Sequence, residues 1–150
     1  MKKIISFLLT MVTILNLGFI TASADAAPDN TIELHEGVYY FEDGSYIITE
    51  RIPSDIQVLS TGTKTYSKIS TYYNNEDVAQ CALKVTGTFE VNYGVSVKCI
   101  NVSATSYVYV DGWTVENVSK SSSTGSGATA SATASGEFVK KLLFITTKRV

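Results

Sequence analysis

Few side chains in this sequence have the chemistry of a catalytic or metal site. The 150 residues include one histidine, His35, and two cysteines, Cys81 and Cys99. A Ser-His-Asp hydrolase would place its serine on a Gly-x-Ser-x-Gly elbow, and the sequence has no such motif. Both cysteines lie in alternating apolar patterns rather than at a helix start, where a thiol is activated. These three side chains are too few for a four-ligand zinc site. We therefore expect no enzyme activity, no cofactor and no metal site.

Acidic side chains cluster in the N-terminal part of the chain and again at 74–77. A glycosidase needs a pair of carboxylates, and four glutamates could supply it: Glu33, Glu36, Glu42 and Glu50. They surround a short predicted hairpin, where solvated charges that oppose edge-to-edge aggregation are the simpler explanation. Asn74-Asn75-Glu76-Asp77 offers oxygen ligands for Ca²⁺ but lacks the spacing of an EF-hand loop. We interpret it as a polar hairpin loop.

Tyrosine is the one residue type present in suggestive excess, with nine Tyr beside a single Trp. Several tyrosines are adjacent in predicted strands, so some must face outward. Aromatic rings exposed on a rigid sheet or loop can stack on sugars or anchor protein contacts at low entropic cost. We predict a ligand contact surface at Tyr93, Tyr107 and Tyr109. The alternative is that Tyr is frequent only because it suits strands.

The first 24 residues have the pattern of a secretory signal peptide. Lys2 and Lys3 precede an apolar run over 4–20, and Ala22-Ser23-Ala24 matches the small-x-small site of signal peptidase. A membrane anchor is the alternative, because a run of this length can just span a bilayer. The cleavage site directly after the run favours removal. We predict a secreted, extracellular protein with no stable membrane insertion after cleavage.

The charge balance excludes nucleic acid as a partner. Removing Lys2 and Lys3 from the 12 basic residues leaves ten against 14 acidic ones, a net charge of −4. No basic stripe is present, so the counterion release that drives nucleic-acid binding has no source. The charged share of 17% is low for a coiled coil or a disordered acidic tail. The expected partner is an unknown extracellular protein or glycan.

The chain after the signal peptide reads as strands throughout. Val, Thr, Tyr and Ser dominate, and apolar residues recur at a spacing of two. We predict an all-β fold, an antiparallel β-sandwich of the immunoglobulin-like type with about seven strands. Residues 25–60 form an N-terminal extension with a β-hairpin, and 61–150 form the sandwich domain. The predicted sandwich strands are 64–73, 79–91, 95–104, 106–110, 113–117, 128–135 and 138–147.

Turn signals set the predicted registers. Asp43-Gly44 predicts a two-residue hairpin turn that pairs Phe41 with Tyr46, and Asn92-Tyr93-Gly94 predicts a loop that sets Val91 opposite Val95. Asp111-Gly112 predicts a third hairpin, with Val110 opposite Trp113.

Two further patterns bear on the core. Trp113 falls on the apolar face of the third hairpin, which makes it the first candidate for a core anchor. Alanine alternates with Ser or Thr from Ala128 to Ala134, which predicts a strand whose small face packs closely on a neighbouring layer. The serine-rich stretch before it, from Ser121 to Gly127, is interpreted as a turn.

The two cysteines leave a disulfide open. Export favours a bridge between Cys81 and Cys99. The predicted register opposes it, because Cys99 lies opposite Gly87, six residues from Cys81, an offset of about 20 Å along the strand. A bridge would need a bend at Gly87 that sends Cys81 into the other sheet. Without one, Cys81 is a small buried apolar residue beside Leu83 and Val85.

Several segments resemble a family of small secreted proteins of Gram-positive bacteria. The resemblance rests on a signal peptide followed by Asp43-Gly44-Ser45-Tyr46-Ile47-Ile48-Thr49-Glu50, Tyr72-Tyr73-Asn74, Val85-Thr86-Gly87-Thr88-Phe89 and the Ala128–Ala134 alternation. It implies export and an all-β fold, and it carries over no catalytic residues. Similar proteins often have Trp at the position of Cys81 and a further Cys beyond the last strand. The resemblance therefore implies that the family's disulfide is missing here and that the chain is shortened after Val150.

Two functions follow as hypotheses. The first is a secreted, non-catalytic binding or interaction protein of unknown ligand. The second is a secreted, bacteriocin-like effector made as a precursor, whose segment 25–60 is removed after export.

Overall fold

The computed structural model of the chain describes residues 4–17, 31–53, 62–92, 94–124 and 129–143. Every regular element within these ranges is a strand, which confirms the predicted all-β class. The strands are β1 (Ile4–Leu17), β2 (Thr31–Leu34), β3 (Gly37–Tyr40), β4 (Tyr46–Ile52), β5 (Gly62–Tyr73), β6 (Ala79–Asn92), β7 (Ser96–Val108), β8 (Trp113–Thr124) and β9 (Ala130–Leu143).

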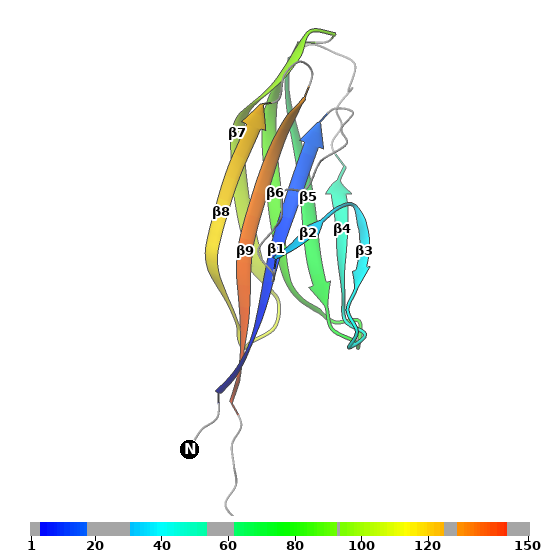
Figure 1. Ribbon diagram of the computed structural model, residues 1–150, viewed down its shortest axis with the longest axis vertical. Coiled ribbons are helices and arrows are strands. Elements are labelled where there is room, and N and C mark those ends of the chain that lie inside the picture. Colours follow the sequence, from blue (N-terminus) through cyan, green and yellow to red (C-terminus); the bar gives the residue numbers. More distant parts are fainter. Residues whose placement is uncertain (1–3, 18–30, 54–61, 93, 125–128, 144–150) are drawn as a thin grey trace, which may run out of the picture.

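The strands form two facing sheets in a sandwich-like arrangement (Figure 1). One sheet is antiparallel, with the order β3-β4-β5-β6-β7, so each strand pairs with its neighbours in sequence. The other is built on the antiparallel pair β8 and β9. β1 extends this pair along the free side of β9, antiparallel and without a register shift, and β2 pairs in parallel with β1.

The core lies between the inner faces of the two sheets. Alternation places Leu83, Val85 and Phe89 of β6 inward, where each is fully buried. Phe138 and Ala132 of β9 face them from the other sheet and are also fully buried. The predicted small alanine face is confirmed over the part of β9 that is described, since Ala130, Ala132 and Ala134 are at most 2% exposed.

The approach of β6 to β9 depends on a residue without a side chain. A Cβ atom on Gly87 would lie 2.5 Å from Phe89 Cε2 and 2.9 Å from Ala132 Cβ. Both distances are shorter than real Cβ contacts, so only glycine lets the Phe89 ring fold back over its own strand. Close packing of the two sheets therefore uses the alanines of β9 together with Gly87.

The hairpin of β3 and β4 has a three-residue loop, and the predicted two-residue turn is wrong. The Gly44 N–H donates to the Phe41 carbonyl (3.1 Å) and the Phe41 N–H donates to the Ser45 carbonyl (2.9 Å). Only Gly44 in this loop has a positive φ, 82°, as a type I turn followed by a bulge requires. The Asp43 carboxylate accepts hydrogen bonds from the Ser45 N–H and hydroxyl, which fixes this turn. Tyr40 therefore pairs with Tyr46.

The turn between β6 and β7 is also displaced from the prediction. The Val95 N–H donates to the Asn92 carbonyl, and Asn92 pairs with Ser96. Val91 is thus opposite Val97 rather than Val95. Val91 and Val97 both pack against the core. An irregularity of register follows between Thr88 and Phe89 of β6.

β7 and β8 do not form the hairpin predicted at Asp111-Gly112. β7 pairs with β6, and β8 pairs with β9 in the other sheet. The residues between them therefore form a corner from one sheet to the other. The Tyr109 N–H donates to the Gln80 carbonyl of β6, whereas the Gly112 carbonyl accepts from Lys141 of β9. Trp113, just after the corner, is 6% exposed, which confirms it as a core residue.

The serine-rich stretch predicted as a turn is in part the second half of β8. Residues 119–124 pair with β9 on an exposed face, and the hydroxyls of Ser119 and Ser135 lie 2.6 Å apart, as do those of Ser123 and Ser131. Likewise, the strands predicted at 128–135 and 138–147 are one strand within the described residues. Cross-strand hydroxyl pairs of this kind stabilise a sheet without apolar contact.

The predicted signal segment contains β1. Its residues 4–17 pair with β9, and the predicted cleavage site lies outside the described residues. Of the residues that the structure describes, none form a helix with the length and hydropathy needed to traverse a bilayer.

Candidate binding surface

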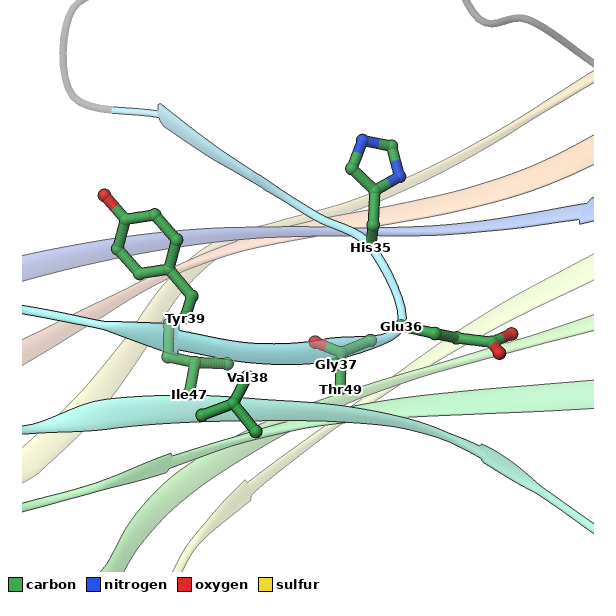
Figure 2. A pocket seen from close by; sticks show the side chains of 7 residues that line it. All are labelled: His35, Glu36, Gly37, Val38, Tyr39, Ile47 and Thr49. Carbon is green, nitrogen blue, oxygen red and sulfur yellow. The ribbon is translucent and has the colours of Figure 1, made fainter.

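Of the predicted histidine and glutamates, His35 and Glu36 line one pocket. A small pocket of about 180 Å³ is lined by His35, Glu36, Gly37, Val38, Tyr39, Ile47 and Thr49. Figure 2 shows the His35 imidazole and the Glu36 carboxylate pointing in different directions from the bend between β2 and β3. This volume is below that of ordinary ligand pockets. Glu36 instead accepts hydrogen bonds from the Arg51 guanidinium at 2.9 and 3.1 Å.

Lys68 is the one buried cationic side chain among the described residues, and it lies on the inner face of β5. Its ammonium is 3.6 Å from Glu36 Oε1. Burial lowers the pKa of Lys68, while Glu36 acts in the opposite direction. Nearby, the Thr49 and Ser70 hydroxyls lie 2.8 Å apart. Among the described residues no buried side-chain nitrogen or oxygen lacks a hydrogen-bond partner, and this polar cluster is no exception.

Metal ligation finds no support in the described ranges. Those residues contain no group of three or more His, Cys, Asp or Glu side chains that could hold a metal ion. The loop 74–77 is a turn in which the Asn74 Oδ1 accepts from the Glu76 and Val78 N–H groups. Its side-chain oxygen is therefore occupied by the backbone, in keeping with a polar hairpin loop.

The two cysteines are free and buried on the inner face of the five-stranded sheet. Cys81 pairs with Val108 and Cys99 pairs with Phe89, eight positions along β6 from Cys81. The separation along the strand is thus about 27 Å, well beyond the reach of a disulfide. Burial raises the pKa of Cys81 to about 12, against a smaller opposing effect of Lys140. The Cys99 thiol donates to the Asn101 carbonyl.

We predict that ionisation of Cys81 weakens the fold in alkali. Because its pKa is higher in the folded chain than the ordinary value of 9.0, the unfolded chain loses its proton first as the pH rises above 9. Between pH 8 and pH 10 the free energy of unfolding should fall by about 1.4 kcal/mol through this group alone. Urea unfolding at both values would show that fall in the wild type and not in Cys81→Ala. Equal pH dependence in the two proteins would contradict the prediction.

The outer face of the five-stranded sheet carries a row of five tyrosines, here called the tyrosine row. It consists of Tyr40 on β3, Tyr46 on β4, Tyr73 on β5, Tyr107 on β7 and Tyr109 just after β7. Strand pairing aligns them, because Tyr46 is opposite both Tyr40 and Tyr73. β6 places alanines opposite two of them, since Ala79 lies opposite Tyr73 and the fully buried Ala82 lies opposite Tyr107.

The rings of the tyrosine row pack on one another. Tyr46 and Tyr73 are stacked, with centroids 5.1 Å apart and planes 11° from parallel. Tyr107 and Tyr109 are stacked at 6.3 Å and 4°. Tyr40 lies 5.7 Å from Tyr46 with a tilt of 45°. Tyr40 and Tyr109 are the most open of the five, at 71% and 52% exposure. The pKa of Tyr109 is raised mainly by burial, with smaller contributions from the neighbouring Tyr107 and Tyr73.

Acidic loops adjoin the tyrosine row at one end of the molecule. The β3–β4 and β5–β6 loops lie together there, and Figure 1 shows the β7–β8 corner at the same end. They carry five exposed acids and no Lys, Arg or His: Glu42, Asp43, Glu76, Asp77 and Asp111. The Tyr46 hydroxyl donates to Asp77 Oδ1 at 2.9 Å, which raises the pKa of Tyr46. Hydrogen bonds from Ser45 lower the pKa of Asp43.

The structure brings together two of the three tyrosines predicted for a contact surface. Tyr107 and Tyr109 stack in the tyrosine row, whereas Tyr93 lies outside the described residues. Tyr40, Tyr46 and Tyr73 were absent from the predicted surface. The predicted register had paired Tyr46 with Phe41 and Tyr40 with Ile47, which separates these rings. A three-residue loop at Asp43-Gly44, had it been predicted, would have placed Tyr40 opposite Tyr46.

The fold and the surface define a class, a sandwich-like all-β protein with an exposed aromatic row beside acidic loops. Comparison with known proteins adds no relative: no family model, no curated protein and no solved structure matches the chain.

Proposed function

We propose that the protein is secreted and acts outside the cell as a non-catalytic binding protein. The tyrosine row is the observation that carries this proposal. Five aromatic side chains with hydroxyl groups lie side by side on a rigid sheet, two of them more than half exposed. Tyrosine provides large contact area and hydrogen bonding at low entropic cost, which is why it is enriched at binding interfaces. The signal-peptide pattern and the family resemblance support export.

We also propose that the sandwich is of the immunoglobulin-like type. Two facing sheets and a buried Trp113 support it. The order β3-β4-β5-β6-β7 is a meander, whereas the immunoglobulin fold uses Greek-key connections. The proposed function depends on the outer face of this sheet and not on its fold family.

The precursor hypothesis receives less support from the structure. Removal of 25–60 would take away β3 and β4, which pair with β5 from Tyr46 to Ile52. Ile47 of β4 is 1% exposed in the core. It would also remove Tyr40 and Tyr46 from the tyrosine row. The arrangement therefore favours a chain that retains β3 and β4.

The proposal is tested by binding of the labelled, secreted protein to washed cells from its native culture. We expect saturable binding that Tyr40→Ala and Tyr109→Ala each weaken about fivefold or more, as interface residues at a hot spot do. Tyr39→Ala is the matched control, because Tyr39 is 48% exposed on the same strand but packs against Phe41 on the other face. Absence of saturable binding, or an equal loss in the control, would contradict the proposal.

A further inference from the structure

We infer that the tyrosine row binds a basic polypeptide segment, rich in arginine or lysine, rather than a glycan. This inference rests on the proposed binding function and names the partner class. It is drawn from the orientation of the rings and from the charge beside them.

The ring orientation disfavours a glycan. A sugar packs flat on an aromatic face, so a glycan platform needs ring faces open to solvent. In the tyrosine row Tyr46 and Tyr73 are stacked with an offset, and so are Tyr107 and Tyr109, so each of these rings turns one face toward a neighbour. Tyr46, Tyr73 and Tyr107 are half-buried, so between its ends the row offers less open ring face than at Tyr40 and Tyr109, together with its hydroxyl groups. These groups accept hydrogen bonds from guanidinium and ammonium donors.

The two ends of the row do have accessible faces. Tyr40 is 71% exposed and tilted against its neighbour, and Tyr109 ends the stack at 52% exposure. A cation over such a face is attracted by the ring quadrupole. The same contact already occurs within the molecule, where the Lys140 ammonium lies 5.6 Å from the centroid of the Trp113 ring. An arginine or lysine of a partner would repeat this contact at each end of the row.

The charge beside the row determines which charge a bound partner segment must carry. The three loops at this end carry five exposed acids and no base of their own, although Lys141 of β9 lies beside the third loop through its bond to the Gly112 carbonyl. Asp77 is held next to the row by the Tyr46 hydroxyl, so its charge and the rings act on one bound segment. Lys84, on the same face of β6, lies two positions beyond Ala82 along the strand. The five acids outnumber Lys84 and Lys141 around the row, so a basic segment is attracted here more strongly than an acidic or neutral one.

The inference is tested by titrating the full secreted protein with defined probes under ¹H–¹⁵N NMR. The probes are an Arg-Gly repeat peptide, a Glu-Gly repeat peptide of equal length and a linear β-linked glucose oligosaccharide. We expect the basic peptide alone to shift the amides around Tyr40, Tyr73 and Tyr109. Added salt should weaken this binding, because the acids are exposed.

Variants separate the contributions of rings and charge. Tyr109→Ala and Asp77→Asn should each weaken binding of the Arg-Gly peptide about two- to fivefold, the range for an exposed cation–π contact or ion pair. The Asn side chain still accepts from Tyr46, so Asp77→Asn removes only charge. Glu116→Gln, an exposed acid on β8, and Tyr39→Ala are the controls and should leave binding unchanged.

Each other outcome overturns the inference. Shifts of the row by the oligosaccharide or the acidic peptide, with none from the basic peptide, would assign a different partner class. Binding of the basic peptide that is unaffected by Tyr109→Ala would place it elsewhere. In these cases, binding to cells that still depends on Tyr40 and Tyr109 would leave the proposed function standing. Loss of that dependence would contradict both the inference and the proposed function.

Discussion

Protein shortened to residues 61–150 is expected to lose its cooperative unfolding transition. The deletion removes the whole of β4, whose seven residues pair with β5, and takes the buried Ile47 out of the core. It also removes Phe41, whose ring packs edge-on against Tyr72 at 6.0 Å, and Glu36, the carboxylate beside Lys68. Burial of Ile47 alone is worth about 1.5–3 kcal/mol. Together these losses approach the total stability of a small domain, about 5–15 kcal/mol.

Guanidinium unfolding followed by far-UV circular dichroism measures this effect, with protein from residue 25 onward as the reference. A milder pair of variants provides the control. Ile47→Ala should cost about 2–5 kcal/mol, as for a buried side chain, and Ile48→Ala on the outer face should cost much less. A shortened protein with an unchanged transition midpoint would contradict the prediction and revive the precursor hypothesis.

Trp113→Ala is expected to lower the free energy of unfolding by about 3–5 kcal/mol, the range for truncation of a buried aromatic residue. Trp113 lies where the chain crosses from one sheet to the other, and it contacts both. Its ring packs edge-on against Tyr72 at 5.7 Å, and its indole N–H donates to Gln80 Oε1 at 3.3 Å. The substitution leaves a cavity between the sheets and removes the donor to Gln80.

Chemical unfolding again provides the measurement, read by circular dichroism because the substitution removes the only tryptophan fluorophore. Trp113→Phe keeps most of the ring volume and should cost clearly less. Val118→Ala on the same strand is the surface control, since Val118 is 42% exposed and should change stability by no more than about 0.5 kcal/mol. A loss below about 1 kcal/mol in Trp113→Ala would show that this residue does not anchor the two sheets.

The features that could be predicted from the sequence are those fixed by alternation within one strand. Inward and outward positions repeat every two residues, so the alanine face of β9 and the burial of Trp113 follow from local pattern alone. The all-β class follows in the same way from the dominance of Val, Thr, Tyr and Ser. None of these inferences needs to know which strand lies next to which.

The candidate site required information that local pattern does not contain. One extra residue in the loop at Asp43-Gly44 shifts the pairing of β3 and β4 by one position, and such a shift changes which side chains are neighbours. Tyr40 and Tyr46 become opposite each other only in the shifted register. Similarly, the apolar alternation around Asp111-Gly112 fits a hairpin as well as a corner between sheets. The choice between them depends on Tyr109 bonding to β6 and Lys141 bonding to Gly112.

The place of β1 bears on how processed chains would meet one another. Cleavage after Ala24 would release β1 and leave the backbone groups along one side of β9 without partners. Open edges of this kind commonly recruit strands from other copies and start aggregation. β5 and β6 of the five-stranded sheet face β1 from the other layer, so its release would also uncover part of their inner faces. Processed chains would therefore meet one another along this side of β9 unless another strand takes the place of β1.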